Sequence, residues 1–414
     1  YQLLLTEDKG MMDDSNLVSS KVSLTLDLPP SCIQFCPAHP EYFVVGTYNL
    51  QRDEKQEGQD GDEDESSAAT KTPQSRNGTL LVFRVDGTEL QQVQTVSQPS
   101  AVLDIRFHLF EGSRNLLAVV SSTGSLAIFK LDPTRNAASP LEHIVTSRCD
   151  DMGEDVLFLQ CNWHPEIPDL IGVTTSTGSA RLLRFDENSR INDQTTDLNI
   201  ANSLEAWCIA FSPGTPDSNQ DRAQVTAYCG GDDSMLRYTS CIWDLNQEAP
   251  CEEPYSPITI KGTHTAGVTA ILPLPLRKDN GRLVVTGSYD DHIRVFIIHD
   301  PHETFGMKRV ELVLEENLGG GVWRLDLVDI HEGPGSTKLR ILASCMHAGS
   351  KLVELNIKDE KDWTCNILAR FEEHKSMNYG SDFVRDERMA ERLRCVSTSF
   401  YDKLLCLWEY EPKS

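Results

Sequence analysis

This sequence has no long apolar run and no excess of basic over acidic residues, and we expect no secretory leader. No apolar run approaches the roughly 18 residues that a membrane-spanning helix needs. The 414 residues carry a formal net charge of −25, which argues against general nucleic-acid binding because contacts to phosphate need a basic face. The leucines at positions 3–5 are too few for the core of a signal peptide. We therefore expect a cytoplasmic protein that binds neither nucleic acid nor membrane.

Metal-binding patterns are also lacking. The twelve cysteines form no C-x-x-C pair and no spacing with histidine that is typical of zinc. Most of them lie inside apolar runs, which is typical of buried, reduced thiols in an intracellular protein. The sequence therefore predicts neither a metal nor another cofactor.

One pattern does recur, and it spans almost the whole chain. A short apolar strand ends in small residues, a tight turn follows, and a strand of alternating polarity comes next, most clearly over residues 283–296. A further apolar strand precedes each copy, so each unit predicts a four-stranded blade. The pattern predicts an all-β, seven-bladed propeller of the WD-repeat type, with copies at residues 43–84, 118–129, 172–185, 227–243, 283–296, 342–355 and 396–408.

The last copy lacks an outer strand, because the chain ends six residues after Trp408. Residues 22–28 alternate strictly in polarity, so we predict that this N-terminal strand completes the seventh blade and closes the ring. The predicted domains are a flexible arm over 1–21 and a propeller over 22–414, interrupted by a disordered acidic loop over 51–78. A closed ring needs no partner for stability, so we expect a monomer.

Several turn sequences, taken in order, resemble those of a single family. They are G-S-Y-D-D-H at 287–292, G-G-V-W-R at 320–324, C-M-H-A-G at 345–349 and S-F-Y-D at 399–402. In this combination the chain resembles the diphthine methyl ester hydrolases, WD-repeat members of the diphthamide biosynthesis pathway. The resemblance implies an enzyme that hydrolyses the methyl ester of methylated diphthine on elongation factor two, which enables the final amidation to diphthamide. Elongation factor two is then the expected partner.

Without that resemblance, a non-catalytic scaffold for protein–protein interaction would be favoured, since propellers host mostly binding functions. The two functions place different demands on the turns, which all open on one face of a propeller around the mouth of its channel. An esterase needs a base or nucleophile and donors that stabilise an oxyanion. The sequence has no G-x-S-x-G nucleophile elbow.

Two histidines are candidates for that chemistry. His347 lies in a turn and is the leading general base, although a hydrogen bond to a neighbouring blade is an equally good interpretation. Cys345 shares a strand face with it if the strand continues, so a Cys–His pair is conceivable; filling a position that needs a small residue is the favoured alternative. His264 is interpreted as structural, with the turn residue Asp290 as its partner.

Arg324 and Asp382 occupy equivalent positions of two adjacent first strands. They form a structural ion pair, or Arg324 holds a carbonyl or oxyanion. The trimethylammonium group that the resemblance implies would favour acidic and aromatic neighbours. The alternative is that the aromatic side chains pack blade against blade. The substrate-binding candidates, besides Asp382, are Trp207, Asp232, Asp233, Tyr289, Trp323, Tyr379 and Tyr401.

Overall fold

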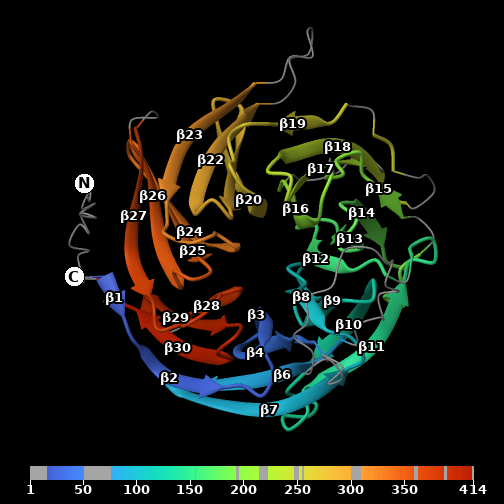
Figure 1. The fold of residues 1–414 in the computed structure, drawn as a ribbon, viewed down its shortest axis with the longest axis vertical. Coiled ribbons are helices and arrows are strands. Elements are labelled where there is room, and N and C mark those ends of the chain that lie inside the picture. The colour runs from blue at the N-terminus through green and yellow to red at the C-terminus, as the bar shows by residue number, and fades with distance from the viewer. Residues whose placement is uncertain are drawn as a thin grey trace, which may run out of the picture.

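The structure is a computed structural model, and seven β-sheets surround a central channel in it (Figure 1). None of the residues it describes belongs to a helix with the length and apolar character needed to cross a bilayer. The predicted all-β propeller with seven blades is confirmed. The described residues are 16–50, 76–153, 155–192, 195–213, 222–246, 251–253, 256–299, 309–358, 362–386 and 389–412.

Each blade runs from a first strand at the channel to an outer strand at the rim. Blades 1 to 3 comprise β3 (Pro30–Cys36), β4 (His39–Thr47), β6 (Arg76–Asp86) and β7 (Glu89–Gln98), with the short β5 (Asn49–Leu50) beside β6; β8 (Val102–Phe107), β9 (Leu116–Ser121), β10 (Ser125–Leu131) and β11 (Leu141–Arg148); and β12 (Phe158–Trp163), β13 (Leu170–Thr175), β14 (Ala180–Arg184) and β15 (Thr196–Asp197).

The remaining blades repeat this order. They comprise β16 (Ala206–Phe211), β17 (Arg222–Gly231), β18 (Leu236–Asp244) and β19 (Ile258–Ile260); β20 (Val268–Lys278), β21 (Gly281–Ser288), β22 (His292–His299) and β23 (Val310–Asn317); β24 (Arg324–Gly333), β25 (Ser336–Ser344), β26 (Ser350–Lys358) and β27 (Asp362–Phe371); and β28 (Gly380–Asp386), β29 (Met389–Ser399) and β30 (Leu404–Tyr410).

The N-terminal strand closes the ring as predicted. Strand β2 (Ser20–Thr25) pairs antiparallel with β30, with Val22 opposite Leu407, and so becomes the outer strand of blade 7. It starts two residues earlier than expected, and β1 (Leu17–Val18) pairs with β27 of blade 6. The rest of the predicted arm, residues 1–15, lies outside the described residues. Residues 51–75 of the predicted acidic loop also lie outside the described residues. Its last three residues, 76–78, belong to β6, which begins at Arg76.

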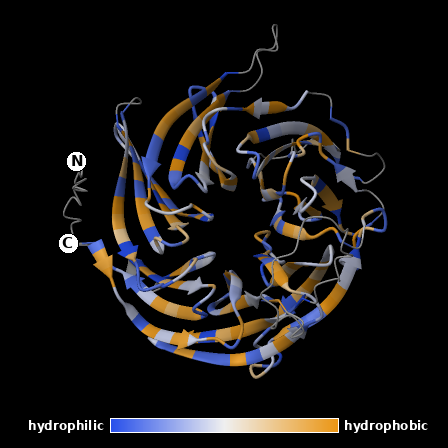
Figure 2. Cartoon of the chain, viewed as in Figure 1, coloured by the Kyte–Doolittle hydropathy of each residue, from blue (hydrophilic) through white to orange (hydrophobic). Residues whose placement is uncertain are grey.

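The apolar core lies between neighbouring blades and not at the centre of the ring. One cluster joins the faces of blades 7 and 1, where Leu405 and Leu407 pack with Phe43 and Phe83, whose rings stack 5.1 Å apart. Polar and apolar residues alternate along outer strands such as β7, as Figure 2 shows, because one face packs on the next blade and the other faces water. This leaves the first strands free to line the channel.

Small residues end the second strand of each blade for a steric reason. A Cβ atom at Gly287 would lie 2.6 Å from both Cγ1 and the carbonyl oxygen of Val322, at the start of the next blade. At Gly230 it would lie 2.6 Å from Cγ1 of Val268. Adjacent blades therefore approach so closely that only a residue without a side chain fits at these two positions.

We predict that Gly287→Ala lowers the free energy of unfolding by about 1–3 kcal/mol, because the added methyl group overpacks the joint between blades 5 and 6. Thermal unfolding measures the loss. Gly333→Ala is the matched control, since its Cβ would meet only Ser336 O at 3.6 Å. Equal melting temperatures for the two variants would contradict the steric explanation.

Candidate active site in the central channel

Side chains of the first strands tie neighbouring blades together around the channel. Gln34 Oε1 on β3 accepts a hydrogen bond from Phe107 N on β8 at 2.6 Å. Asp382 Oδ2 on β28 accepts one from Phe35 N at 2.7 Å, at the joint where blade 7 meets blade 1. These contacts fix polar side chains that would otherwise be free to rotate in the channel.

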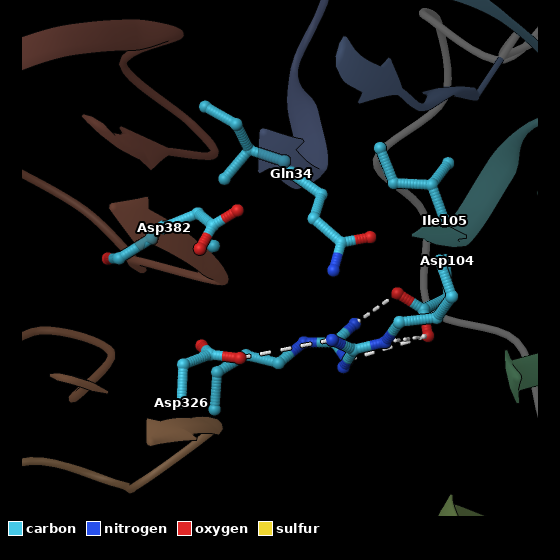
Figure 3. A pocket seen from close by; sticks show the side chains of 10 residues that line it. Gln34, Asp104, Ile105, Asp326 and Asp382 are labelled. Atoms are coloured by element: carbon cyan, nitrogen blue, oxygen red, sulfur yellow. Dashed lines mark hydrogen bonds and ion pairs between the residues drawn. The ribbon is translucent and has the colours of Figure 1, made fainter. Parts of the chain in front are cut away.

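A cluster of charges lies among these strands (Figure 3). Arg324 Nη2 on β24 donates to Asp104 Oδ1 on β8 at 2.5 Å, across the channel from blade 6 to blade 2. Arg106 Nε lies 3.5 Å from Asp104 Oδ2, and Arg106 Nη1 lies 4.0 Å from Asp326 Oδ1. Of the two interpretations of Arg324, the ion pair with Asp382 does not form, because the guanidinium pairs with the buried carboxylate of Asp104 instead.

The charged cluster borders a cavity of about 450 Å³ along the channel. The charged part of its lining comes from blades 2, 6 and 7, through Arg106, Arg324, Asp326 and Asp382, whereas blades 4 and 5 contribute apolar residues such as Ile209 and Leu272. Trp323, which directly precedes β24, also lines it. A ligand that carries both a polar and an apolar part is suited to such a divided cavity.

Two carboxyl groups in this cluster bind protons more tightly than usual. Burial raises the pKa of Asp382 to about 8, and the neighbouring charge of Asp326 adds to the effect. Burial also raises the pKa of Asp326, against the attraction of Arg106 and Arg324. A carboxyl group with a pKa near neutrality can both accept and donate a proton at working pH.

The predicted aromatic residues do come together, over the end of the channel where the first strands begin. Trp323 is at their centre, with ring centroids 5.6 Å from Trp207, 5.9 Å from Tyr289 and 5.1 Å from Tyr379. The rings of Phe400 and Tyr401 continue the contact from Tyr379. Trp323 is the one member of this aromatic cluster that also lines the cavity, and it therefore connects the aromatic cluster with the charged residues.

The predicted acidic residues separate into two kinds. Asp232 Oδ1 accepts the indole N–H of Trp207 at 2.5 Å and so belongs to the aromatic cluster. Asp233 and Asp290 are each only 5% exposed and pair with Arg237 and Arg294 of their own blades. Their carboxylates therefore stabilise the turns of their own blades.

His264 is buried and structural, but its partner differs from the predicted one. Its Nε2 lies 2.9 Å from Thr286 Oγ1, and burial lowers its pKa to about 4, so the ring stays neutral. The carboxylate of Asp290 instead accepts the backbone N–H of Thr265 at 2.9 Å. The hydroxyl of Thr286 therefore takes the place predicted for Asp290, whose carboxylate is already bound to the backbone N–H of Thr265.

Cys345 and His347 do not form a pair. Met346 between them adopts a positive φ of 41°, which ends the strand alternation that would place both side chains on one face. Cys345 is buried, and burial raises the pKa of its thiol to about 12. His347 is exposed and makes no polar contact with any residue that the structure describes, so its role as a base stays a prediction.

No family model matches the chain. Curated relatives do. A Mus musculus protein named diphthine methyltransferase is 26% identical over 91% of this chain and 71% of its own length. Proteins of the same name from Schizosaccharomyces pombe and Saccharomyces cerevisiae are each 25% identical, covering 96% and 92% of this chain and 99% and 95% of their own lengths.

The chain is similar to proteins named diphthine methyltransferase over most of its length. The resemblance seen in the turn sequences is thereby confirmed, and the relatives bear the name of an enzyme of the diphthamide pathway.

In this chain, sequence reasoning missed Asp104, Arg106 and Asp326. Their signal was present, because Asp104 and Arg106, like Arg324 and Asp326, are charged residues spaced by two with an apolar residue between them in a first strand. Charges at such positions of a first strand point toward the channel. Together the site offers guanidinium donors, a carboxyl group that titrates near neutrality, and aromatic faces at one end.

Proposed function

We propose that this chain hydrolyses the methyl ester of methylated diphthine on elongation factor two, leaving the carboxylate that the final amidation to diphthamide consumes. Its homologues bear the name of enzymes acting on diphthine. The observation that carries the proposal is the position of Trp323, which touches three other aromatic rings and also lines the cavity that holds the charged cluster.

The two ends of the substrate group match the aromatic cluster and the charged cluster, which Trp323 connects. Methylated diphthine carries a trimethylammonium group close to its ester. Aromatic faces attract such a cation, and a carboxylate such as Asp232 adds to that attraction. The ester carbonyl would then reach the guanidinium groups of Arg324 and Arg106, whose N–H groups suit an oxygen that gains negative charge.

Hydrolysis, and not methyl transfer to the carboxylate, is the direction we propose, although the relatives are named as transferases. A carboxyl group of raised pKa beside guanidinium donors suits attack by water on a carbonyl carbon. The reaction would take place in the cytoplasm with elongation factor two as partner and with this chain as a monomer. The scaffold alternative gives no use for a carboxyl group of raised pKa beside a cavity.

The test is methanol release from elongation factor two that carries diphthine with a deuterated methyl ester. We expect labelled methanol and a protein product that has lost one methyl group. Trp323→Ala should lower kcat/KM by about 10- to 30-fold, the loss of one desolvated cation–π contact of about 2 kcal/mol. Trp363→Ala on the outer strand β27 is the matched control and should leave it unchanged.

Two results would overturn the proposal. Binding of the modified factor without release of methanol would support the scaffold function. A gain of a methyl group by the factor in the presence of a sulfonium methyl donor would establish transfer instead.

A further inference from the structure

Arg106 has hydrogen-bond donors that no described residue uses. Its guanidinium makes ion pairs with Asp104 at 3.5 Å and Asp326 at 4.0 Å, but no hydrogen bond to either. Arg324, in contrast, donates twice to Asp104, at 2.5 and 3.4 Å. The Nε atom of Arg106 is buried without an acceptor among these residues. Such unused donors cost free energy unless a ligand oxygen accepts from them.

Asp382 shows the complementary property. Backbone amides alone hold its carboxyl group, Phe35 N on Oδ2 at 2.7 Å and Phe383 N on Oδ1 at 2.8 Å. No arginine, lysine or histidine in the described part of the chain makes an ion pair with it. Each oxygen keeps a second lone pair, so the group is fixed in place and still able to accept a proton.

A small cavity of about 10 Å³ lies between these two side chains. Its lining includes both Arg106 and Asp382. Figure 3 shows Asp382 around one space with Gln34 and Asp326, which also line the cavity. Roughly 10–15 Å³ is enough for one water molecule when the lining is polar. Five of its lining residues, from four different blades, also border the 450 Å³ cavity, so a water molecule here would be next to a bound ester.

We propose that Asp382 is the general base and Arg106 the oxyanion-binding group of this hydrolysis, which rests on the proposed function. The Asp382 carboxylate takes a proton from water as the water oxygen bonds to the ester carbonyl carbon. The carbonyl oxygen becomes an oxyanion that accepts hydrogen bonds from Arg106. When the tetrahedral intermediate collapses, the bond from carbon to the methoxy oxygen breaks, and Asp382 returns its proton to form methanol. The products are a carboxylic acid, which ionises, and methanol.

Burial and two charges set the pKa of Asp382, since Asp326 faces it from β24 and raises the pKa while Arg106 faces it from β8 and lowers it. The buried Cys395 thiol on β29 and Gln34 on β3 are uncharged neighbours. Asp104 and Arg324 pair with each other at the far side of the same pocket. A base must be deprotonated, so kcat/KM should rise with pH through about 8. A bound trimethylammonium group stabilises the carboxylate, so the same rise in kcat should occur at lower pH.

The experiment measures methanol release by the full chain with Asp382→Asn and Arg106→Gln. Asparagine keeps an oxygen that can accept from Phe35 N, so the joint between blades 7 and 1 is retained. We expect kcat to fall about 10²- to 10⁴-fold for Asp382→Asn, with KM nearly unchanged and the rise with pH abolished. Arg106→Gln should lower kcat about 10²- to 10³-fold. Asp244→Asn is the control, a buried carboxylate that accepts the backbone N–H of Asn246 away from the channel.

The outcomes separate this inference from the proposed function. If the unaltered protein releases no methanol, the proposed function fails and this inference fails with it. If the unaltered protein is active and Asp382→Asn keeps both its rate and its pH profile, only the assignment of Asp382 is wrong. Loss of activity in His347→Ala, with Asp382→Asn fully active, would place the base on the rim of the mouth.

Discussion

Replacing Asp104 by alanine is expected to lower the free energy of unfolding by about 3–5 kcal/mol, because it leaves two largely buried guanidinium groups without their shared carboxylate. Asp104 is only 1% exposed, and it pairs with Arg324 and Arg106 from two different blades. The backbone N–H of Cys161 loses its acceptor as well. Urea unfolding at neutral pH gives the loss, provided that the dependence on urea concentration is the same for both proteins.

Asp151→Ala is the matched control for that experiment. Its carboxylate makes two hydrogen bonds to Arg181, at 2.7 and 2.8 Å, but it is 60% exposed, so water can replace it at a cost of about 0–1 kcal/mol. A further variant that adds Arg324→Met to Asp104→Ala should recover part of the loss, since it removes one of the unpaired charges. The interpretation fails if Asp104→Ala is no more costly than Asp151→Ala.

The ring was predictable from the sequence because each blade is specified by local signals. Residues 283–296 contain the small-residue strand end, the turn and the alternating strand in one stretch, and β21 and β22 follow it closely. The small residue has a steric cause at Gly287, so the same signal recurs at other joints such as Gly230. Closure was predictable because the strand that contains Val22 alternates in polarity and blade 7 lacked an outer strand of its own.

The aromatic cluster was also predictable, since turns of one kind all reach the same face of a propeller. The charged cluster was not, because its contacts join residues as far apart as Asp104 and Arg324, which are 220 positions apart in sequence. Which guanidinium meets which carboxylate depends on the closed ring. The positive φ angle of Met346 likewise separates Cys345 from His347, and no local sequence pattern predicts that angle.

Asp382→Asn is expected to stabilise the protein at alkaline pH by about 2–4 kcal/mol relative to its effect at pH 4, where only the lost acceptor of Phe383 N distinguishes the two proteins. The pKa of Asp382 is about 8 in the folded protein, against 3.8 for an ordinary aspartate. A raised folded pKa means that the native state keeps a proton that the unfolded chain has lost. The unaltered protein therefore loses stability as pH rises from about 4 through 8, and the asparagine variant lacks this loss.

Thermal unfolding of both proteins between pH 4 and pH 9 measures the difference. The buried histidines His164, His264 and His374, whose pKa values burial lowers to about 4, act in the opposite direction over part of this range. They are the same in both proteins, so their effect cancels in the comparison. Parallel curves would show that the extra proton belongs to Asp326 or to no group in the channel.

A stabilising substitution that abolishes hydrolysis would also explain why the fold retains Asp382. An asparagine would serve the hydrogen bond to Phe35 N equally well, so the joint between the blades does not require a carboxyl group. What only the carboxyl group provides is a site for a proton beside Arg106 and the cavity. The protein would then be less stable with Asp382 than with asparagine because the catalytic reaction requires a carboxylate that activates water.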